Sequence, residues 1–145
     1  MVVYPTKSKS RNMSVLVFAE QSEGKYKKTA LEVVSYGKEL ATAQGSELVV
    51  LTINQKETGV LSSYGADKIL TVEDDRLKSF SAKAFADCIS QAAKKVGASS
   101  VIIDSSSDGL YLAPILAVKL EAGFASNVVA QPESLEPFIV KRKAF

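Results

Sequence analysis

Apolar runs of strand length alternate with segments of helical periodicity along most of this chain. The first run, Val15–Ala19, is continuously apolar, as expected of a strand that helices cover on both faces. Three further runs predict strands: Leu48–Ile53, Lys68–Val72 and Ser100–Asp104. The pattern therefore predicts a series of buried strands that longer segments separate.

Helical segments fill the gaps between these strands. Apolar and small residues recur at helical spacing over about Lys27–Gln44 and over Ala82–Val96, and a glycine follows each segment. A further helix follows the polar loop Ser105–Gly109 and ends near Gly123. Three shorter elements complete the pattern, namely a helical stretch at Thr58–Tyr64, a fifth strand at Asn127–Ala130 and an edge or exit strand at Pro137–Val140. The alternation predicts an α/β fold: a doubly wound parallel sheet of about five strands, with helices on both faces and right-handed crossovers.

Length and composition favour one domain. The chain has 145 residues, of which 46% are hydrophobic and 23% charged, an ordinary balance for a protein with a buried core. We expect a single α/β domain over residues 13–145. Residues 1–12 are expected to be a disordered leader because they lack apolar periodicity. An organellar presequence is the alternative, because Lys7, Lys9 and Arg11 stand there without an acid.

Charge and cysteine content exclude several classes of protein. The formal charge of +2 comes from 18 basic and 16 acidic side chains that are interspersed, so no nucleic-acid partner is expected. No apolar run approaches the ~20 residues that cross a bilayer, so no membrane insertion is expected. The lone cysteine, Cys88, rules out an internal disulfide and suits a reducing compartment. The predicted location is cytoplasmic, with the mitochondrial matrix as the alternative if the basic leader is a presequence.

Two loops are candidates for a ligand site. Open α/β sheets bind ligands beyond the carboxyl ends of the strands, where the strand order reverses, and Glu20–Gly24 and Ser105–Gly109 follow two such ends. The first loop presents two carboxylates, which repel phosphate. In the second, backbone N–H groups at a helix start can hold an anion. The candidate site, a vestigial nucleotide or anion site, comprises Ser105, Ser106, Asp108 and Gly109. The alternative is that these side chains only cap the helix.

No other residue set points to catalysis or to a metal. The chain has no histidine and no Gly-rich phosphate loop, so no catalytic residue and no metal site are expected. Cys88 has no imidazole to generate a thiolate and is interpreted as a structural thiol. Asp74–Asp75 is interpreted as a solvated or capping pair rather than an acid and a base. Lys141–Lys143 alternates between the faces of a predicted strand, which favours an edge or partner contact over a phosphate patch. Tyr111 and Phe124 flank the last long helix, as interface anchors or as cover for the core.

Three segments resemble one protein family. Met13–Glu20, Gly65–Leu70 and Gly109–Pro114 resemble the amino-terminal domain of the electron transfer flavoprotein alpha subunit. The resemblance runs from about residue 13 to residue 145, and its most specific element is Gly109–Leu120 followed by Gly123–Val129.

The chain departs from the family at one helix. The family usually has an arginine after the glycine of this element and another after its proline, whereas Leu110 and Ile115 stand near those places here. An arginine is a strong phosphate ligand, and an apolar side chain is not. The departure weakens any assignment of an anion to this helix start.

The resemblance implies a division of labour between domains and subunits. In the family, FAD is held mainly by the carboxy-terminal domain of the alpha subunit, with help from the beta subunit, which also carries a structural AMP. This chain then corresponds to the scaffold domain that packs on the beta subunit, and no cofactor is expected in this chain alone, because the flavin-binding segments would follow Phe145. Electrons would arrive from acyl-CoA or related dehydrogenases and leave toward a quinone reductase or another acceptor, so the chain is expected to be a carrier fragment and not an enzyme.

Two alternatives belong to other functional classes. The scaffold is adenine-nucleotide-alpha-hydrolase-like, so a free-standing adenine-nucleotide-binding domain of the stress-protein type is the first alternative. Against this alternative, the chain lacks the glycine-spaced phosphate segment that is typical of that family. A hydrolase of adenine nucleotides is the second, and neither a phosphate loop nor a histidine-bearing signature supports it.

Overall fold

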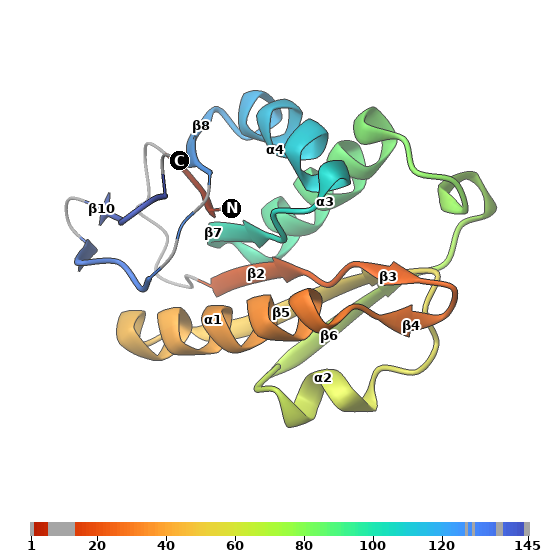
Figure 1. Ribbon diagram of the computed structural model, residues 1–145, viewed down its shortest axis with the longest axis horizontal. Helices are drawn as coiled ribbons and strands as arrows, with labels where there is room; N and C mark the ends of the chain where they lie inside the picture. Colours follow the sequence, from red (N-terminus) through yellow and green to blue (C-terminus); the bar gives the residue numbers. More distant parts are fainter. Residues whose placement is uncertain (1, 6–13, 127, 129, 136–137, 144–145) are drawn as a thin grey trace.

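Four parallel strands form the centre of the sheet in the computed structural model. They are β2 (Ser14–Phe18), β5 (Glu47–Ile53), β6 (Lys68–Val72) and β7 (Ala98–Ile103). Two strands that run antiparallel to their neighbours extend the sheet on one side, namely β1 (Val2–Pro5) and β8 (Ala122–Ala125). The strand order is β6-β5-β2-β7-β1-β8 (Figure 1). The structure describes residues 2–5, 14–126, 128, 130–135 and 138–143.

Helices cover both faces of this sheet, which confirms the predicted doubly wound α/β architecture. One face carries α1 (Lys28–Gln44) and the short α2 (Gly59–Ser63), and the other carries α3 (Ala82–Val96) and α4 (Ser107–Lys119) (Figure 1). A 3₁₀ turn, η1 (Asp75–Leu77), precedes α3. In the described part of the chain, none of these helices is long and apolar enough to cross a membrane.

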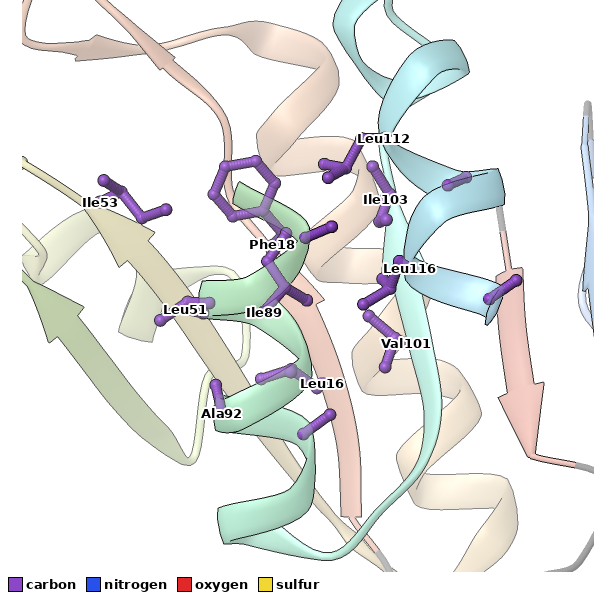
Figure 2. Close-up of a cluster of buried hydrophobic side chains, with 14 of the residues drawn as sticks. Leu16, Phe18, Leu51, Ile53, Ile89, Ala92, Val101, Ile103, Leu112 and Leu116 are labelled. Atoms are coloured by element: carbon purple, nitrogen blue, oxygen red, sulfur yellow. The ribbon is translucent and has the colours of Figure 1, made fainter. Parts of the chain in front are cut away.

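Two hydrophobic clusters fill the layers on either side of the sheet. Along β2, Val15 and Val17 join the cluster under α1, whereas Leu16 and Phe18 join the cluster under α3 and α4. Figure 2 shows the second cluster, in which side chains from three strands meet α3 and α4. Because successive residues of a strand point to opposite faces, both faces of β2 are buried. This explains the unbroken apolar run in the sequence.

The approach of α1 to the sheet depends on a glycine. Gly37 is buried at the centre of this helix. A Cβ atom at this position would lie 2.5 Å from Val17 Cγ2 and 3.0 Å from Leu48 Cδ1. The first distance is shorter than any normal carbon–carbon contact. Gly37 therefore allows the helix to pack closely on β2 and β5.

The ends of α1 and α3 follow the signals predicted from the sequence. Gly45 and Gly97 end these helices with φ of 65° and 64°, in the left-handed region that glycine adopts without strain. Ser81 begins α3, and its hydroxyl accepts a hydrogen bond from the Ala84 N–H at 3.4 Å. The predicted boundaries of both helices are therefore confirmed to within one residue.

The amino-terminal segment corrects one prediction. Val2–Pro5 form β1, inside the sheet, and are not a disordered leader. Val2 pairs with Ile102 of β7 on one side and with Ala125 of β8 on the other. A run of four residues shows no periodicity by itself, and its pairing partners lie about a hundred residues away, so only long-range pairing specifies it. The rest of the predicted leader, residues 6–12, lies outside the described residues.

The strand after α4 also corrects a prediction. We predicted a strand at residues 127–130, of which 127 and 129 lie outside the described residues, but the strand is β8 at Ala122–Ala125. The sequence predicts that the preceding helix ends near Gly123, whereas α4 ends at Lys119 and Gly123 lies within β8. The turn is made instead by Glu121, whose φ is 51°. An Ala-Gly-rich segment has low β propensity, and pairing with β1 overrides it.

The described part of the carboxy-terminal segment forms no edge strand of the main sheet. Of the predicted strand at residues 137–140, β10 (Phe138–Ile139) pairs only with β9 (Ser134–Leu135) in a separate two-stranded sheet. Residue 137 lies outside the described residues. The predicted basic strand beyond it is also wrong, because Arg142 forms an isolated bridge with Val128. Short segments with a proline and a charge run carry no register signal, so contacts with the rest of the fold decide their pairing.

Candidate functional site

The strand order reverses between β2 and β7. From β2 the chain continues to β5 and β6 on one side of the sheet and then crosses to β7 on the other side. The loops that follow β2 and β7 therefore lie beside each other, and the Ser106 hydroxyl donates a hydrogen bond to Glu20 Oε2 at 2.8 Å. The structure thus brings the two predicted loops together at the place where open α/β sheets bind ligands.

The start of α4 is capped by its own serine. Ser106 has φ −70° and ψ 168°, and its Oγ accepts a hydrogen bond from the Gly109 N–H at 3.1 Å. Asp108 lies in the first turn, where the helix dipole favours a carboxylate. Because the Ser106 hydroxyl also donates to Glu20, its donor and one acceptor position are used within the protein. Ser105 is exposed. An anion role for Ser105, Ser106, Asp108 and Gly109 remains a prediction.

Carboxylates outnumber cations at this edge of the sheet. The Glu20 side chain is 12% exposed, and its Oε1 accepts a hydrogen bond from Lys27 Nζ at 2.7 Å. This hydrogen bond is the main cause that raises the pKa of Lys27. Thr29 Oγ1 donates to Asp104 Oδ2 at 2.5 Å, and Asp108 stands nearby on α4. A phosphate that entered here would face three carboxylates and two ammonium groups, those of Lys27 and Lys78, which are already paired.

A small cavity opens between the two loops. Its volume is about 120 Å³, and three phenylalanines, Phe18, Phe80 and Phe85, form part of its lining. The rings pack edge to face, with centroids 6.0 Å apart for Phe18 and Phe85 and 5.1 Å apart for Phe80 and Phe85. In Figure 2, Phe18 lies between Ile53 and Leu112, which also line the cavity. Ligand pockets commonly measure about 300–1,000 Å³, so this cavity is too small for a nucleotide.

The loop after β2 is a hairpin, which the sequence analysis did not predict. Its strands are β3 (Gln21–Ser22) and β4 (Lys25–Tyr26). The turn residues Glu23 and Gly24 have φ of 52° and 78°, as two-residue hairpin turns require. The side chain of Gln55, only 6% exposed, fixes the turn by donating to the Gly24 carbonyl at 2.6 Å. An acidic residue followed by glycine is a hairpin signal that could have found this turn.

The acidic pair after β6 is used to cap a turn. Asp74 precedes η1, and its carboxylate accepts hydrogen bonds from the Arg76 N–H at 2.9 Å and from Arg76 Nη2 at 2.7 Å. The bonds from the Arg76 side chain and backbone lower the pKa of Asp74 to about 2. Asp75 pairs with Lys78 at 2.8 Å. These contacts support the interpretation of the pair as capping and solvated residues.

Neither the cysteine nor the basic segment assembles a reactive site. Cys88 is half-buried on α3, and burial raises the pKa of its thiol, as does the nearby charge of Asp74. A raised pKa disfavours the nucleophilic thiolate at neutral pH. At the basic segment, Lys141 pairs with Glu133 at 2.9 Å and Arg142 donates to Ser126 at 3.0 Å. In the described part of the chain, no group of three or more His, Cys, Asp or Glu side chains is arranged to hold a metal.

The two α4 positions at which the resemblance leads us to expect arginine, Leu110 and Ile115, have different environments. Leu110 is 53% exposed on the outer side of the helix, and Ile115 packs against the cluster beneath it. Tyr111, which was considered an interface anchor or cover for the core, is 71% exposed. Phe124 on β8 is 43% exposed. Tyr111 therefore contributes little to the core of this chain.

The family model that matches this chain and the similar proteins point to the same family. The family model described as "Electron transfer flavoprotein domain" matches residues 15–145. An electron transfer flavoprotein subunit alpha from Clostridium acetobutylicum is 29% identical over 95% of this chain and 43% of its own length. An acryloyl-CoA reductase electron transfer subunit beta from Anaerotignum propionicum is 29% identical over 78% of this chain and 32% of its own length.

A third relative is named as a subunit of a dehydrogenase. The LctC subunit of a lactate dehydrogenase (NAD(+),ferredoxin) from Acetobacterium woodii is 25% identical over 82% of this chain and 29% of its own length. The chain thus spans less than half the length of these relatives. The family match covers most of the chain, including all the parallel strands and long helices. The chain therefore belongs to the electron transfer flavoprotein domain family.

Proposed function

We propose that this chain is the amino-terminal scaffold domain of an electron transfer flavoprotein alpha subunit, which packs on the beta subunit. The observation that carries the proposal is the family match over residues 15–145. The relatives support it because they are named as electron transfer subunits, including an alpha subunit. The chain then acts as part of a redox carrier and not as an enzyme with catalytic residues of its own.

FAD is proposed to bind to the complete heterodimer and not to this chain alone. A flavin dinucleotide needs a large pocket and partners for its diphosphate. The cavity of about 120 Å³ at the switch point offers too little room, and Glu20 and Asp108 in its lining repel an anion. The flavin would pass electrons, one at a time, from acyl-CoA or related dehydrogenases to an acceptor. This domain would serve as the scaffold that supports the flavin-binding domain.

A cytoplasmic location accompanies this proposal. The relatives reported above come from bacteria, which have no mitochondrial matrix. The alternative of a presequence relied on residues 1–12, and part of that segment forms β1. A strand that pairs with β7 and β8 in the folded protein is expected to remain in it.

Two binding measurements test the proposed function. The purified chain is mixed with FAD and passed through a desalting column, and separately it is mixed with the electron transfer flavoprotein beta subunit of its own organism and analysed by sedimentation velocity. We expect no retained flavin colour and a one-to-one complex with the beta subunit. Retention of equimolar FAD by the chain alone, or sedimentation of two separate species, would contradict the proposal.

A nucleotide-binding domain is the second candidate, because the loops after β2 and β7 meet at the switch point beside the start of α4. This arrangement is the usual place for a nucleotide in an open α/β sheet. The three carboxylates and the small cavity oppose it. Calorimetric titration with ATP and with AMP distinguishes the two functions, and micromolar binding of either nucleotide would favour the second candidate.

A further inference from the structure

The outward face of α4 is apolar from Leu110 to Val118, over about two and a half turns. Its exposed side chains include Leu110, Tyr111 and Val118, which are 53%, 71% and 79% exposed, and Pro114 is also exposed. At about 100° per residue these four positions fall within one arc of the helix, opposite the buried side chains Leu112 and Leu116. We call Leu110, Tyr111, Pro114 and Val118 the α4 surface. A helix that is apolar on both faces is typical of one that is covered on both faces.

The other long helices do not share this property. On α1 the exposed positions carry mainly charged and polar residues, among them Lys28, Glu32 and Glu39. On α3 they carry Lys83, Gln91, Lys94 and Lys95. The contrast shows that the exposed positions of these two helices are mainly polar. The α4 surface is therefore an exception that needs a specific reason.

Charge distribution limits what can cover the α4 surface. None of its four residues is ionisable, and the nearest charges along the helix are Asp108 at its start and Lys119 at its end. Lys119 already forms an ion pair with Asp87 of α3. A charged group that packed on this surface would lose water without gaining a partner. An anionic membrane is also a poor match, because membrane-surface helices carry Lys or Arg along the border of the apolar face. The complementary occupant is an uncharged, apolar protein surface.

The size of the α4 surface points to a folded partner. Four side chains supply a few hundred Å² at most, whereas a stable interface needs about 800 Å² per partner. The contact must therefore extend beyond α4. The adjacent β8 is suited to this, because it contacts α4, forms the outer strand of the six-stranded sheet and exposes Phe124. A folded protein, and not a short peptide, is large enough to span both elements.

We infer that the α4 surface is the site at which the partner subunit packs on this chain. The inference rests on the proposed function, which supplies the beta subunit as the partner, and adds the place of contact. Tyr111 is the aromatic member of the surface and is a large, rigid side chain of the type that dominates binding energy at interfaces.

The test compares charged substitutions on two helices. Val118→Glu and Tyr111→Glu each place a carboxylate on the α4 surface, and Gln91→Glu places one on an exposed position of α3 as the matched control. All three positions are exposed, so the variants are expected to fold, which thermal melting followed by circular dichroism verifies. Affinity for the electron transfer flavoprotein beta subunit is then measured by calorimetry. We expect the dissociation constant to rise about 30-fold or more for the two α4 variants and less than about twofold for Gln91→Glu.

Hydrogen exchange gives a second readout that needs no substitution. We expect the amides of Ser107–Lys119 to exchange more slowly in the complex than in the free chain, and those of Lys28–Gln44 to be unchanged. If the unmodified chain binds the beta subunit, and Val118→Glu and Tyr111→Glu bind equally well, the α4 surface is not the contact and the proposed function stands. If the unmodified chain does not bind the beta subunit, the proposed function is wrong, and the beta subunit is not the protein that covers the α4 surface. Self-association that Val118→Glu abolishes would instead assign the surface to a second copy of the chain.

Discussion

At the scale of single residues, Gly37 is a place where α1 packs closely on the sheet. Gly37→Ala introduces a methyl group that would lie 2.5 Å from Val17 Cγ2. Val17 is β-branched and fully buried, so it cannot turn away without disturbing the strand. We expect the free energy of unfolding to fall by about 1–3 kcal/mol, as measured by urea denaturation.

A second glycine provides the control for this substitution. Gly59 begins α2, and a Cβ atom there would have no atom within 4 Å. Gly59→Ala is therefore expected to leave stability unchanged or to raise it by about 0.4–1 kcal/mol, because alanine restricts the unfolded chain. Equal effects of the two substitutions would show that close packing at Gly37 is not the cause.

Asp74 makes stability depend on pH in a defined window. Its pKa is about 2 in the folded protein, compared with an ordinary value of 3.8, mainly because of hydrogen bonds from Arg76. A lowered pKa contributes stability that is complete above the unfolded pKa and is lost as the pH falls through the folded pKa. We expect Asp74→Asn to be less stable than the unmodified protein at pH 7, and the difference to disappear between about pH 4 and pH 2. Urea denaturation across this range measures it.

The asparagine variant isolates the charge of Asp74. Asn is also a good residue at the start of a helix, so the hydrogen bond to the Arg76 N–H is kept. Asp75→Asn serves as the control, because it removes a charge from an exposed ion pair with Lys78. A stability difference between Asp74→Asn and the unmodified protein that stays constant down to pH 2 would rule out the proposed cause.

Some contacts of the candidate site could be predicted from local sequence and others could not. The cap at Ser106 is predictable, because its hydroxyl bonds to a backbone group three residues away. The bond between Thr29 and Asp104 joins residues 75 positions apart. Only the strand order places these side chains together, and the sequence does not state which loops become neighbours. The surplus of carboxylates at the switch point was therefore predicted only for the loop after β2.

At the scale of elements, the start of α4 tests whether Ser106 has a structural role. Ser106→Ala removes the hydrogen bond that the Gly109 N–H donates and the bond that Glu20 accepts. We expect the free energy of unfolding to fall by about 1–2 kcal/mol, the usual cost of losing a cap. Urea denaturation at neutral pH checks this value.

Two further substitutions separate capping from charge. Ser106→Asn keeps a capping oxygen without adding a charge, so most of the stability is expected to return. Ser106→Asp also caps, but it places a second carboxylate beside Glu20, which lies 2.8 Å from the Ser106 hydroxyl. We expect Ser106→Asp to be less stable than Ser106→Asn. If Ser106→Asp is instead more stable than Ser106→Asn, a second carboxylate beside Glu20 does not destabilise the start of α4.

The central elements were predictable because each carries its own signal. β2 and β5 are apolar runs buried on both faces, and α1 and α3 end at glycines. β1 and β8 lack such signals: β1 is held by pairing with β7 and β8, and β8 by pairing with β1. The sequence pattern therefore predicts no strand at β1 and places the strand after α4 at residues 127–130 instead of at β8. Long-range pairing, and not local propensity, specifies this side of the sheet.

The dependence of β8 on β1 leads to a prediction about truncation. Within the described residues, β8 pairs in the sheet only with β1. Removal of residues 1–5 is expected to abolish the protection of the Ala122–Ala125 amides against hydrogen exchange, while the parallel strands β2, β5 and β6 stay protected. Mass spectrometry of peptides after exchange measures both regions. Removal of Met1 alone is the control and is expected to change neither.

The truncation result has two informative alternatives. Protection of β8 that survives the loss of β1 would mean that contacts with α4 hold this strand in place. Loss of protection throughout the sheet would mean that β1 stabilises the whole domain. Only a loss of exchange protection that is confined to β8 supports the conclusion that β1 links β7 and β8.

At the scale of the whole molecule, the two hydrophobic clusters share their strands. The cluster under α1 and the cluster under α3 and α4 both take side chains from β2, β5 and β7. Loss of packing on one face would release the strands that the other face requires. We therefore expect a single domain that unfolds as a unit and that includes β1 as well as the predicted residues 13–145.

One substitution on each face tests this cooperativity. Leu112 is 1% exposed in the cluster under α4, and Leu40 is fully buried in the cluster under α1. Leu112→Ala and Leu40→Ala each leave a cavity and are expected to lower the free energy of unfolding by about 2–5 kcal/mol. If the chain is a single cooperative domain, each change shifts one transition in urea, and exchange of the amides of α1 and of α4 accelerates together in both variants. If Leu112→Ala accelerates exchange only in α3 and α4 and leaves α1 unchanged, the two faces unfold separately and the shared strands do not couple them.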